Sequence, residues 1–182
     1  MYLIEPTGWL AGAKRCPSPN YNQRPSGDDI SLLLIHNISL PAAEFGGPYV
    51  HQLFTNCIDC DAHASFQDLR GLTVSAHLFI NRKGIIHQFV SFNDRAWHAG
   101  VSQFEGRDNC NDYSIGIELE GADDINYTDA QYRELITVTK SLQSYYPAIT
   151  TNRIVGHSDV APGRKTDPGI AFDWRYYKTA LG

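Results

Sequence analysis

The sequence is poor in several residue types, and these shortages exclude whole classes of protein. Its 182 residues include one methionine and four cysteines, and only 15 Lys and Arg stand against 20 Asp and Glu. The resulting net charge of −5 argues against general binding to nucleic acid or to an anionic membrane, because both need a basic surface. A local basic pocket is still compatible with this balance.

Long hydrophobic runs are also missing. The densest apolar run, at residues 32–35, is far shorter than the 18 or more residues that cross a bilayer, and it is short enough to be a strand. The first residues lack the basic and long apolar segments of a signal peptide. We therefore expect a cytoplasmic protein with reduced thiols and no membrane partner, and a monomer as the default state.

The composition that is present is typical of a soluble globular protein, with 42% hydrophobic and 19% charged residues. This length favours one domain over residues 1–182, and the first 30 residues, rich in Pro, Gly and Asn, are expected to be mostly surface coil. Strands and helices alternate along the remainder, and two of the strands are joined by a turn ending in Gly84. This order predicts an α/β domain with a mixed sheet. The expected strands are 31–38, 75–81, 85–90, 114–121 and 153–156, and the expected helices are 49–55, 128–146 and 172–181.

Seven histidines are many for a small acidic chain, so their placement matters. His36 ends the first predicted strand, where a side chain is held rigidly and still reached by solvent. Considered alone, it is better explained as a core histidine bonded to a backbone carbonyl. His157 opens a turn-rich segment that also carries Lys165 and Asp167, and Pro168 biases Asp167 toward an extended conformation.

Two imidazoles and a carboxylate with one position open to water make a catalytic zinc set. Such an ion lowers the pKa of its water to about 7 and polarises a carbonyl. His36, His157 and Asp167 are the candidate ligands. The alternative is a surface loop with ordinary solvated charges.

Glu118 lies on the polar face of the alternating strand and could accept a proton from the zinc-bound water. Glu120 lies on the same face, and spacing does not choose between them; a solvated strand face is the alternative for both. Lys165 could stabilise the oxyanion that forms when a carbonyl is attacked, or it could simply be solvated.

The remaining histidines and the cysteines are not expected to bind metal. Cys57 and Cys60 form a CxxC pair, and a structural zinc site with nearby His51 and His63 is conceivable. There is no second CxxC, however, and no thioredoxin-like arrangement. The other histidines are interpreted as structural, with His98 in an aromatic corner, and the lone cysteines as inert thiols: His77, His87, His98, Cys16 and Cys110.

Ordered motifs nevertheless match one family over nearly the whole chain. The chain resembles the type 2 N-acetylmuramoyl-L-alanine amidases, most closely the members that act inside the cell. The matching segments are 17–21, 35–41, 44–48, 74–77, 95–102, 110–112, 115–121 and 156–169. The loop 57–73 departs from the family pattern and carries the CxxC pair.

The resemblance implies a mixed β-sheet flanked by α-helices, one catalytic Zn²⁺, and hydrolysis of the amide between (1,6-anhydro-)N-acetylmuramic acid and L-alanine in peptidoglycan recycling. By position, it gives His36, His157 and Asp167 as zinc ligands. It gives Glu118 as the proton acceptor, in place of Glu120, and Lys165 as the residue that stabilises the transition state. It also suggests three residues that line the substrate cleft: Asn37, Trp97 and Arg164.

Two other functions remain to be separated from this one. A non-catalytic peptidoglycan-recognition module would be expected to have lost a ligand or the glutamate, and this sequence keeps all of them. A zinc peptidase acting within the stem peptide would differ in the bond that it cuts.

Overall fold

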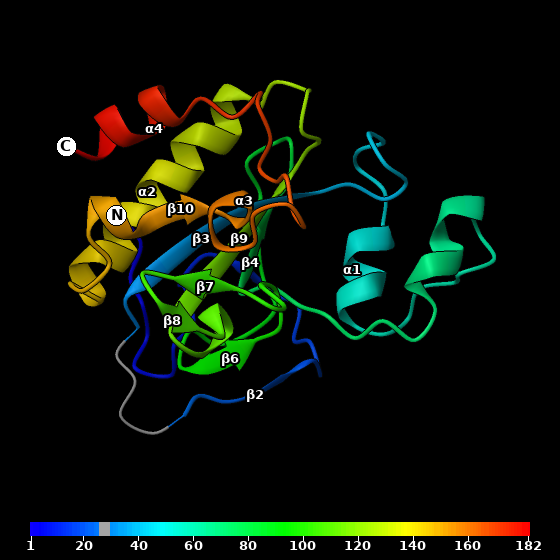
Figure 1. The fold of residues 1–182 in the computed structure, drawn as a ribbon, viewed down its shortest axis with the longest axis horizontal. Helices are drawn as coiled ribbons and strands as arrows, with labels where there is room; N and C mark the ends of the chain where they lie inside the picture. The colour runs from blue at the N-terminus through cyan, green and yellow to red at the C-terminus, as the bar shows by residue number, and fades with distance from the viewer. Residues whose placement is uncertain (26–29) are drawn as a thin grey trace.

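A computed structural model describes residues 1–25 and 30–182 (Figure 1). Its centre is a six-stranded sheet with the strand order β1-β5-β4-β9-β3-β10. Only β4 and β5 run antiparallel, and every other neighbouring pair is parallel. The predicted α/β fold with a mixed sheet flanked by helices is confirmed. The strands are β1 (Lys14–Arg15), β3 (Leu32–Ile38), β4 (Leu78–Ile80), β5 (Ile86–Gln88), β9 (Ser114–Glu120) and β10 (Ile154–Gly156).

The helices and two small ribbons complete the described fold. The ribbons pair β2 (Tyr21–Gln23) with β6 (Asp94–Ala96) and β7 (Gln103–Phe104) with β8 (Arg107–Asp108). The α-helices are α1 (Tyr49–Phe54), α2 (Asp129–Tyr145), α3 (His157–Val160) and α4 (Trp174–Leu181). The 3₁₀ helices are η1 (Ala64–Leu69), η2 (Cys110–Asp112) and η3 (Thr151–Arg153).

Every strand and helix expected from local sequence is present, but β4 and β5 are shorter than the expected ranges 75–81 and 85–90, and α4 begins two residues later than expected. Gly84 has a φ of 77°, the left-handed conformation that the turn between β4 and β5 needs and that glycine adopts without strain. At the start of α2, the Thr128 hydroxyl accepts a hydrogen bond from the Gln131 N–H, and the Gln131 side chain accepts one from the Thr128 N–H. This capping box satisfies backbone donors that the helix leaves unpaired.

The two faces of the sheet have different roles. Ile115, Ile117 and Leu119 of β9 point to one face and pack in the main core with Leu135 and Leu142 of α2. Figure 1 shows α2 and α4 together on one side of the molecule, while α1 and the 3₁₀ helix after it project at another. The alternate residues of β9 point to the opposite face, which α1 helps to cover.

The first 25 residues are mostly without regular structure, but they are tied to the edge of the sheet. Lys14 and Arg15 pair with β5, and Leu10 is fully buried. The Leu10 N–H donates to the Gln88 side chain, which donates in turn to the carbonyl of Gly8. The part of the expected N-terminal coil at 26–29 lies outside the described residues. Within the described part of the chain, no helix is long and apolar enough to span a bilayer.

Candidate functional site

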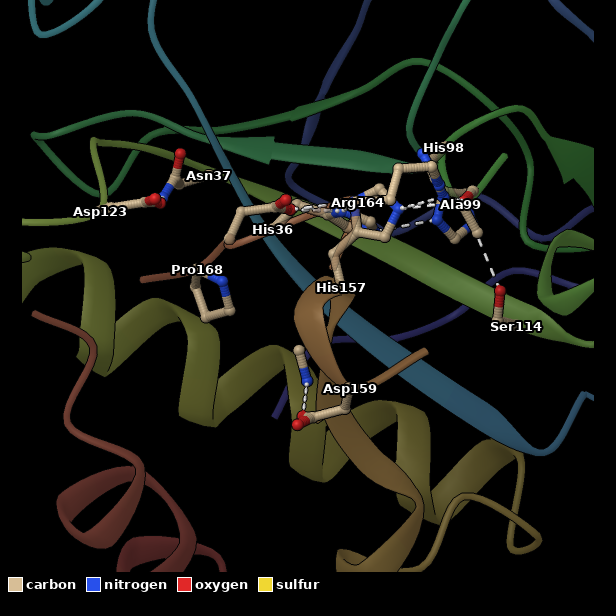
Figure 2. Close-up of polar contacts among 12 residues, drawn as sticks. His36, Asn37, His98, Ala99, Ser114, Asp123, His157, Asp159, Arg164 and Pro168 are labelled. Atoms are coloured by element: carbon tan, nitrogen blue, oxygen red, sulfur yellow. Dashed lines mark hydrogen bonds and ion pairs between the residues drawn. The ribbon is translucent and has the colours of Figure 1, made fainter. Parts of the chain in front are cut away.

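Three side chains from separate parts of the chain meet at the carboxyl ends of β3 and β10. His36 lies near the end of β3, His157 is the first residue of α3 directly after β10, and Asp167 follows ten residues later. His36 Nδ1 lies 3.1 Å from His157 Nδ1 and 3.0 Å from Asp167 Oδ2. His157 Nδ1 lies 3.1 Å from the same Oδ2 atom, so the three ligand atoms form a triangle. The two imidazole rings meet edge to face, with their centroids 4.5 Å apart, and both are labelled in Figure 2.

The geometry of this triangle fits a metal ion. Ligand atoms around a tetrahedral ion with bonds of roughly 2.0–2.1 Å lie about 3.3 Å apart, close to the three edges observed. Hydrogen bonding accounts poorly for the triangle, because a ring nitrogen offers one proton or one lone pair and each Nδ1 faces two partners. A cation accepts electron pairs from all three atoms. His36, His157 and Asp167 therefore form a group able to hold a metal.

The protonation states suit metal binding. Burial lowers the pKa of His36, which favours the neutral imidazole. Burial raises the pKa of Asp167, but the close contacts of its carboxylate with the ring nitrogens of His157 and His36 outweigh burial and hold this pKa below its usual range. Neutral imidazoles beside a carboxylate are the forms that bind metal.

Outer partners fix the orientation of both rings. His157 Nε2 donates to the Ala99 carbonyl at 3.0 Å, which leaves Nδ1 with its lone pair directed at the site. Arg164 Nη2 donates at 2.7 Å to the same carbonyl and at 2.7 Å to that of Val101. Arg164 thus secures the loop that holds His157.

His98 is the partner of the other ring, and sequence reasoning did not assign it this position. His36 Nε2 lies 3.0 Å from His98 Nδ1, and His98 Nε2 lies 3.4 Å from Ser114 Oγ (Figure 2). Burial lowers the pKa of His98 well below its usual value, so the ring is neutral and its Nδ1 accepts from His36. Gly116 makes room for this ring, because a Cβ there would lie 2.5 Å from His98 Nδ1. The pairing of a histidine with a distant strand glycine has no local sequence signal.

Glu118 is the direct neighbour of His36 across β3 and β9. Its side chain is 9% exposed, and its Oε2 atom is buried with no hydrogen-bond partner among the described residues. Burial, followed by the charge of Asp167, raises the pKa of Glu118 well above its usual value. An unpaired buried carboxylate oxygen is costly, which indicates a functional role for this group.

Glu120 has a different environment, although it lies on the same face of β9. Its two carboxylate oxygens accept hydrogen bonds from the backbone N–H groups of Gly46 and Arg82. Both glutamates are buried, so neither lies on a solvated strand face. Glu120 joins two turns to the sheet, whereas Glu118 is left available for chemistry.

A cleft of about 230 Å³ opens over these residues. Glu118, His157 and Asp167 line its polar side, together with the exposed Lys165. Apolar side chains from α1, from the end of β3 and the residues after it, and from the end of η1 and the residues after it form the other wall: Ile38, Leu40, Leu53, Phe54, Leu69, Leu72 and Val74.

The three expected substrate-binding residues differ in their position. Asn37 and Trp97 line the cleft. Asn37 donates to Asp123 at 2.8 Å, and Trp97 donates through Nε1 to Asn22 at 2.7 Å, so both are held in place. Arg164 is not among the described residues that line the cleft, since its guanidinium holds the loop near Ala99.

A second group able to hold a metal consists of Cys16, His51 and His87. From the sequence, Cys16 is interpreted as an inert thiol and His87 as structural, and His51 is considered only as a possible partner of the CxxC pair. The fold instead brings these three residues together. Within 1–25 and 30–182, Cys57 and Cys60 belong to neither metal-competent group, and all four cysteines are free thiols.

Comparison with known proteins identifies the family. Residues 26–170 match the family model described as N-acetylmuramoyl-L-alanine amidase. The chain is 57% identical over 174 residues to 1,6-anhydro-N-acetylmuramyl-L-alanine amidase AmpD from Escherichia coli, covering 96% of this chain and 94% of that one. A crystal structure of a selenomethionine AmpD derivative has a TM-score of 0.95 at 54% identity, with 99% of both chains covered.

A more distant neighbour was solved with a ligand. AmpDh3 from Pseudomonas aeruginosa, in complex with anhydromuramic pentapeptide, has a TM-score of 0.63 at 32% identity, covering 86% of this chain and 61% of that chain. The match to the family model extends over most of the sequence and is supported by relatives of similar length. The chain belongs to the N-acetylmuramoyl-L-alanine amidase family.

Proposed function

We propose that this chain is a zinc-dependent amidase that hydrolyses the bond between 1,6-anhydro-N-acetylmuramic acid and the L-alanine of muropeptides, in cytoplasmic peptidoglycan recycling. One observation carries the proposal: three metal-competent ligand atoms meet beside the unpaired, buried carboxylate oxygen of Glu118, at the floor of a cleft. The relatives named 1,6-anhydro-N-acetylmuramyl-L-alanine amidase support the substrate class.

His36, His157 and Asp167 are the residues that would hold the zinc ion. When bound in such a set, zinc lowers the pKa of a water molecule to about 7 and polarises a carbonyl oxygen. His98 and the Ala99 carbonyl keep the two Nδ1 atoms directed at the site. A zinc ion held by three protein ligands would have room for a water molecule as a further ligand.

Glu118 handles the protons of the reaction. Its carboxylate accepts one proton from the attacking water. The water oxygen forms a bond to the carbonyl carbon of the lactyl group, the part of N-acetylmuramic acid that is joined to L-alanine. Glu118 then returns this proton to the amide nitrogen as the carbon–nitrogen bond breaks, and L-alanine leaves with a free amino group. The raised pKa of Glu118 favours holding this proton between the two steps.

Lys165 supplies positive charge where the oxyanion develops. It lines the same cleft as Glu118 and Asp167 and is separated from Asp167 by one residue. A charge placed there stabilises the tetrahedral species more than the neutral amide, and this difference lowers the barrier. Asn37 and Trp97 also line the cleft, and their role in this proposal is to orient the substrate.

The apolar wall of the cleft fits the uncharged part of the substrate. Trp97 offers an aromatic face of the kind that packs against a sugar ring. AmpDh3, solved in complex with anhydromuramic pentapeptide, supports an anhydromuramyl peptide as the class of ligand.

Product analysis by mass spectrometry tests the bond that is cut. Incubation with an anhydro-muropeptide is expected to release the intact stem peptide with L-alanine at its N-terminus, and the free anhydro sugar. Cleavage inside the peptide would show a peptidase instead, and binding without any product would show a recognition module. Equal release of peptide from intact sacculi and from anhydro-muropeptide would contradict the recycling role.

A further inference from the structure

The cluster Cys16, His51 and His87 lies outside the cleft, at the β1–β5 edge of the sheet. Cys16 follows β1 directly, His87 is the middle residue of β5, and His51 lies in α1. Lys14 pairs with His87, so Cys16, two residues further along, points to the same face as His87. The cluster therefore joins three elements that are distant in the sequence.

The distances within the cluster match a metal site. His51 Nε2 lies 2.9 Å from His87 Nδ1, and Cys16 Sγ lies 3.8 Å from the same Nδ1. All three ligand atoms lie within 4.8 Å of one another. Around a tetrahedral zinc ion, bonds of about 2.0 Å to nitrogen and about 2.3 Å to sulfur place such atoms roughly 3.3–3.6 Å apart.

Hydrogen bonding alone does not account for this convergence. His87 Nδ1 faces both the His51 ring nitrogen and the Cys16 sulfur, although it offers only one lone pair or one proton. A cation would accept electron pairs from all three atoms at once. Because the three residues are only half-buried, a fourth coordination position is open to solvent.

We propose that Cys16, His51 and His87 form a second metal site, with a preference for a borderline-soft divalent ion such as Zn²⁺. One thiolate and two imidazoles are ligands that suit zinc better than magnesium or calcium. The site adds to the proposed amidase function and does not depend on it.

The environment acts differently on the thiol and on the two rings. Burial raises the pKa of Cys16, so an ion bound here would have to displace the thiol proton. Burial, followed by the neighbouring His51 and Lys14, lowers the pKa of His87 to about 4. Burial also lowers the pKa of His51, so both rings are neutral near pH 7, which is the metal-binding form. The His51 ring packs 5.6 Å from the ring of Phe79 and 5.3 Å from that of Phe89, and these contacts restrict its rotation.

The two metal sites are separate but lie on the same face of the sheet. One line of paired residues runs from His36 to Glu118, Phe79 and His87. Three strand spacings of about 4.8 Å place His87 roughly 14 Å from His36, so one ion cannot serve both sites.

The location of the second site indicates its effect. Its ion would join the sheet edge to α1, and α1 also supplies Leu53 and Phe54 to the cleft wall. The bound ion would fix this wall in place. We expect its role to be structural, because the site lies outside the cleft that holds Glu118.

Cobalt substitution tests the proposal with a readout specific to sulfur. The ligand set of His36, His157 and Asp167 contains no thiolate, so a thiolate-to-cobalt charge-transfer band reports a cysteine ligand elsewhere. Titrating Co²⁺ into the metal-free protein is expected to give two bound equivalents and this band. Cys16→Ser is expected to remove the band and one equivalent, and His51→Gln to remove the same equivalent.

Cys57→Ser combined with Cys60→Ser is the matched control, because it removes the other two accessible thiols. The control is expected to keep both equivalents and the band. A band that survives Cys16→Ser, a band that is lost in the control, or a wild-type protein that binds one equivalent without a band would overturn the proposal.

Discussion

We expect replacement of Gly116 by alanine to perturb the proposed zinc site, although Gly116 is not one of the proposed ligands or substrate-binding residues. A Cβ at this position would lie 2.5 Å from His98 Nδ1 and 2.6 Å from both Cε1 and Cγ. Ordinary contacts of a Cβ begin at 3.4 Å, so the ring must move by about 1 Å. His98 is partly buried and lies between His36 and Ser114, and such a shift breaks its contact with His36.

The size of the effect follows from these contacts. Overpacking a buried site costs about 1–3 kcal/mol of unfolding free energy. Loss of an outer partner of a metal-binding histidine weakens metal binding by roughly 10- to 100-fold. We therefore expect Gly116→Ala to lower stability in urea unfolding by an amount in this range, and to lower zinc affinity by the same factor in competition with a chelator.

A double variant separates the action through His98 from a general disturbance of β9. If Gly116→Ala acts only by displacing His98, then its combination with His98→Ala binds zinc as weakly as His98→Ala alone, and no weaker. Part of the stability lost in Gly116→Ala returns, because the clash is gone. Independent, additive losses of zinc affinity would refute the reasoning, and so would wild-type zinc affinity in Gly116→Ala.

Three further changes have distinct expected outcomes. Lys165→Ala should lower kcat by roughly 10²- to 10³-fold with little change in bound zinc. An unchanged kcat would contradict the assignment of Lys165 as the residue that stabilises the oxyanion. Burial, followed by the charge of Arg24, holds the pKa of His77 well below its usual value. Below about pH 6.5, His77 is therefore protonated in the unfolded chain but stays neutral in the native state. Stability should thus fall with decreasing pH by up to roughly 1.4 kcal/mol per unit from this residue, and His77→Gln should show a shallower fall in urea unfolding; an equal slope would contradict this assignment. Thr128→Ala should cost about 1 kcal/mol of unfolding free energy by removing the cap of α2, and a cost near zero would show that the capping box is dispensable.

Elements coded by nearby residues were predictable from the sequence. The start of α2 depends on Thr128 and Gln131, which are three residues apart, and the turn between β4 and β5 depends on Gly84. The alternation in β9 correctly placed Glu118 and Glu120 on one face. Local signals of this kind act over a few residues, so a single sequence shows them directly.

The difference between the two glutamates was not predictable from spacing. Glu120 is satisfied by backbone groups of Gly46 and Arg82, which lie 74 and 38 residues away. Glu118 has no such partner on its buried oxygen among the described residues. Only the fold determines which of the two carboxylates is paired with backbone groups. The choice of Glu118 over Glu120 came from its position in the family motif, because the spacing of the two residues is compatible with either.

The histidines show the same limit more strongly. His98 belongs to a short aromatic segment, yet its contact with His36 spans 62 positions and depends on the missing side chain of Gly116. Cys16 and His87 are separated by 71 positions and meet because β1 pairs with β5. Pairings set by strand register at long range leave no periodic trace in the sequence.

The most direct test of the account is the zinc content and the turnover of a single variant, Glu118→Gln. Glutamine keeps the volume of the side chain and cannot accept the proton of the attacking water. The account predicts zinc content equal to that of the wild type, measured by mass spectrometry of the metal, with kcat on anhydro-muropeptide lowered by roughly 10²- to 10⁴-fold. Full turnover in this variant would contradict the assignment of Glu118 as the proton acceptor.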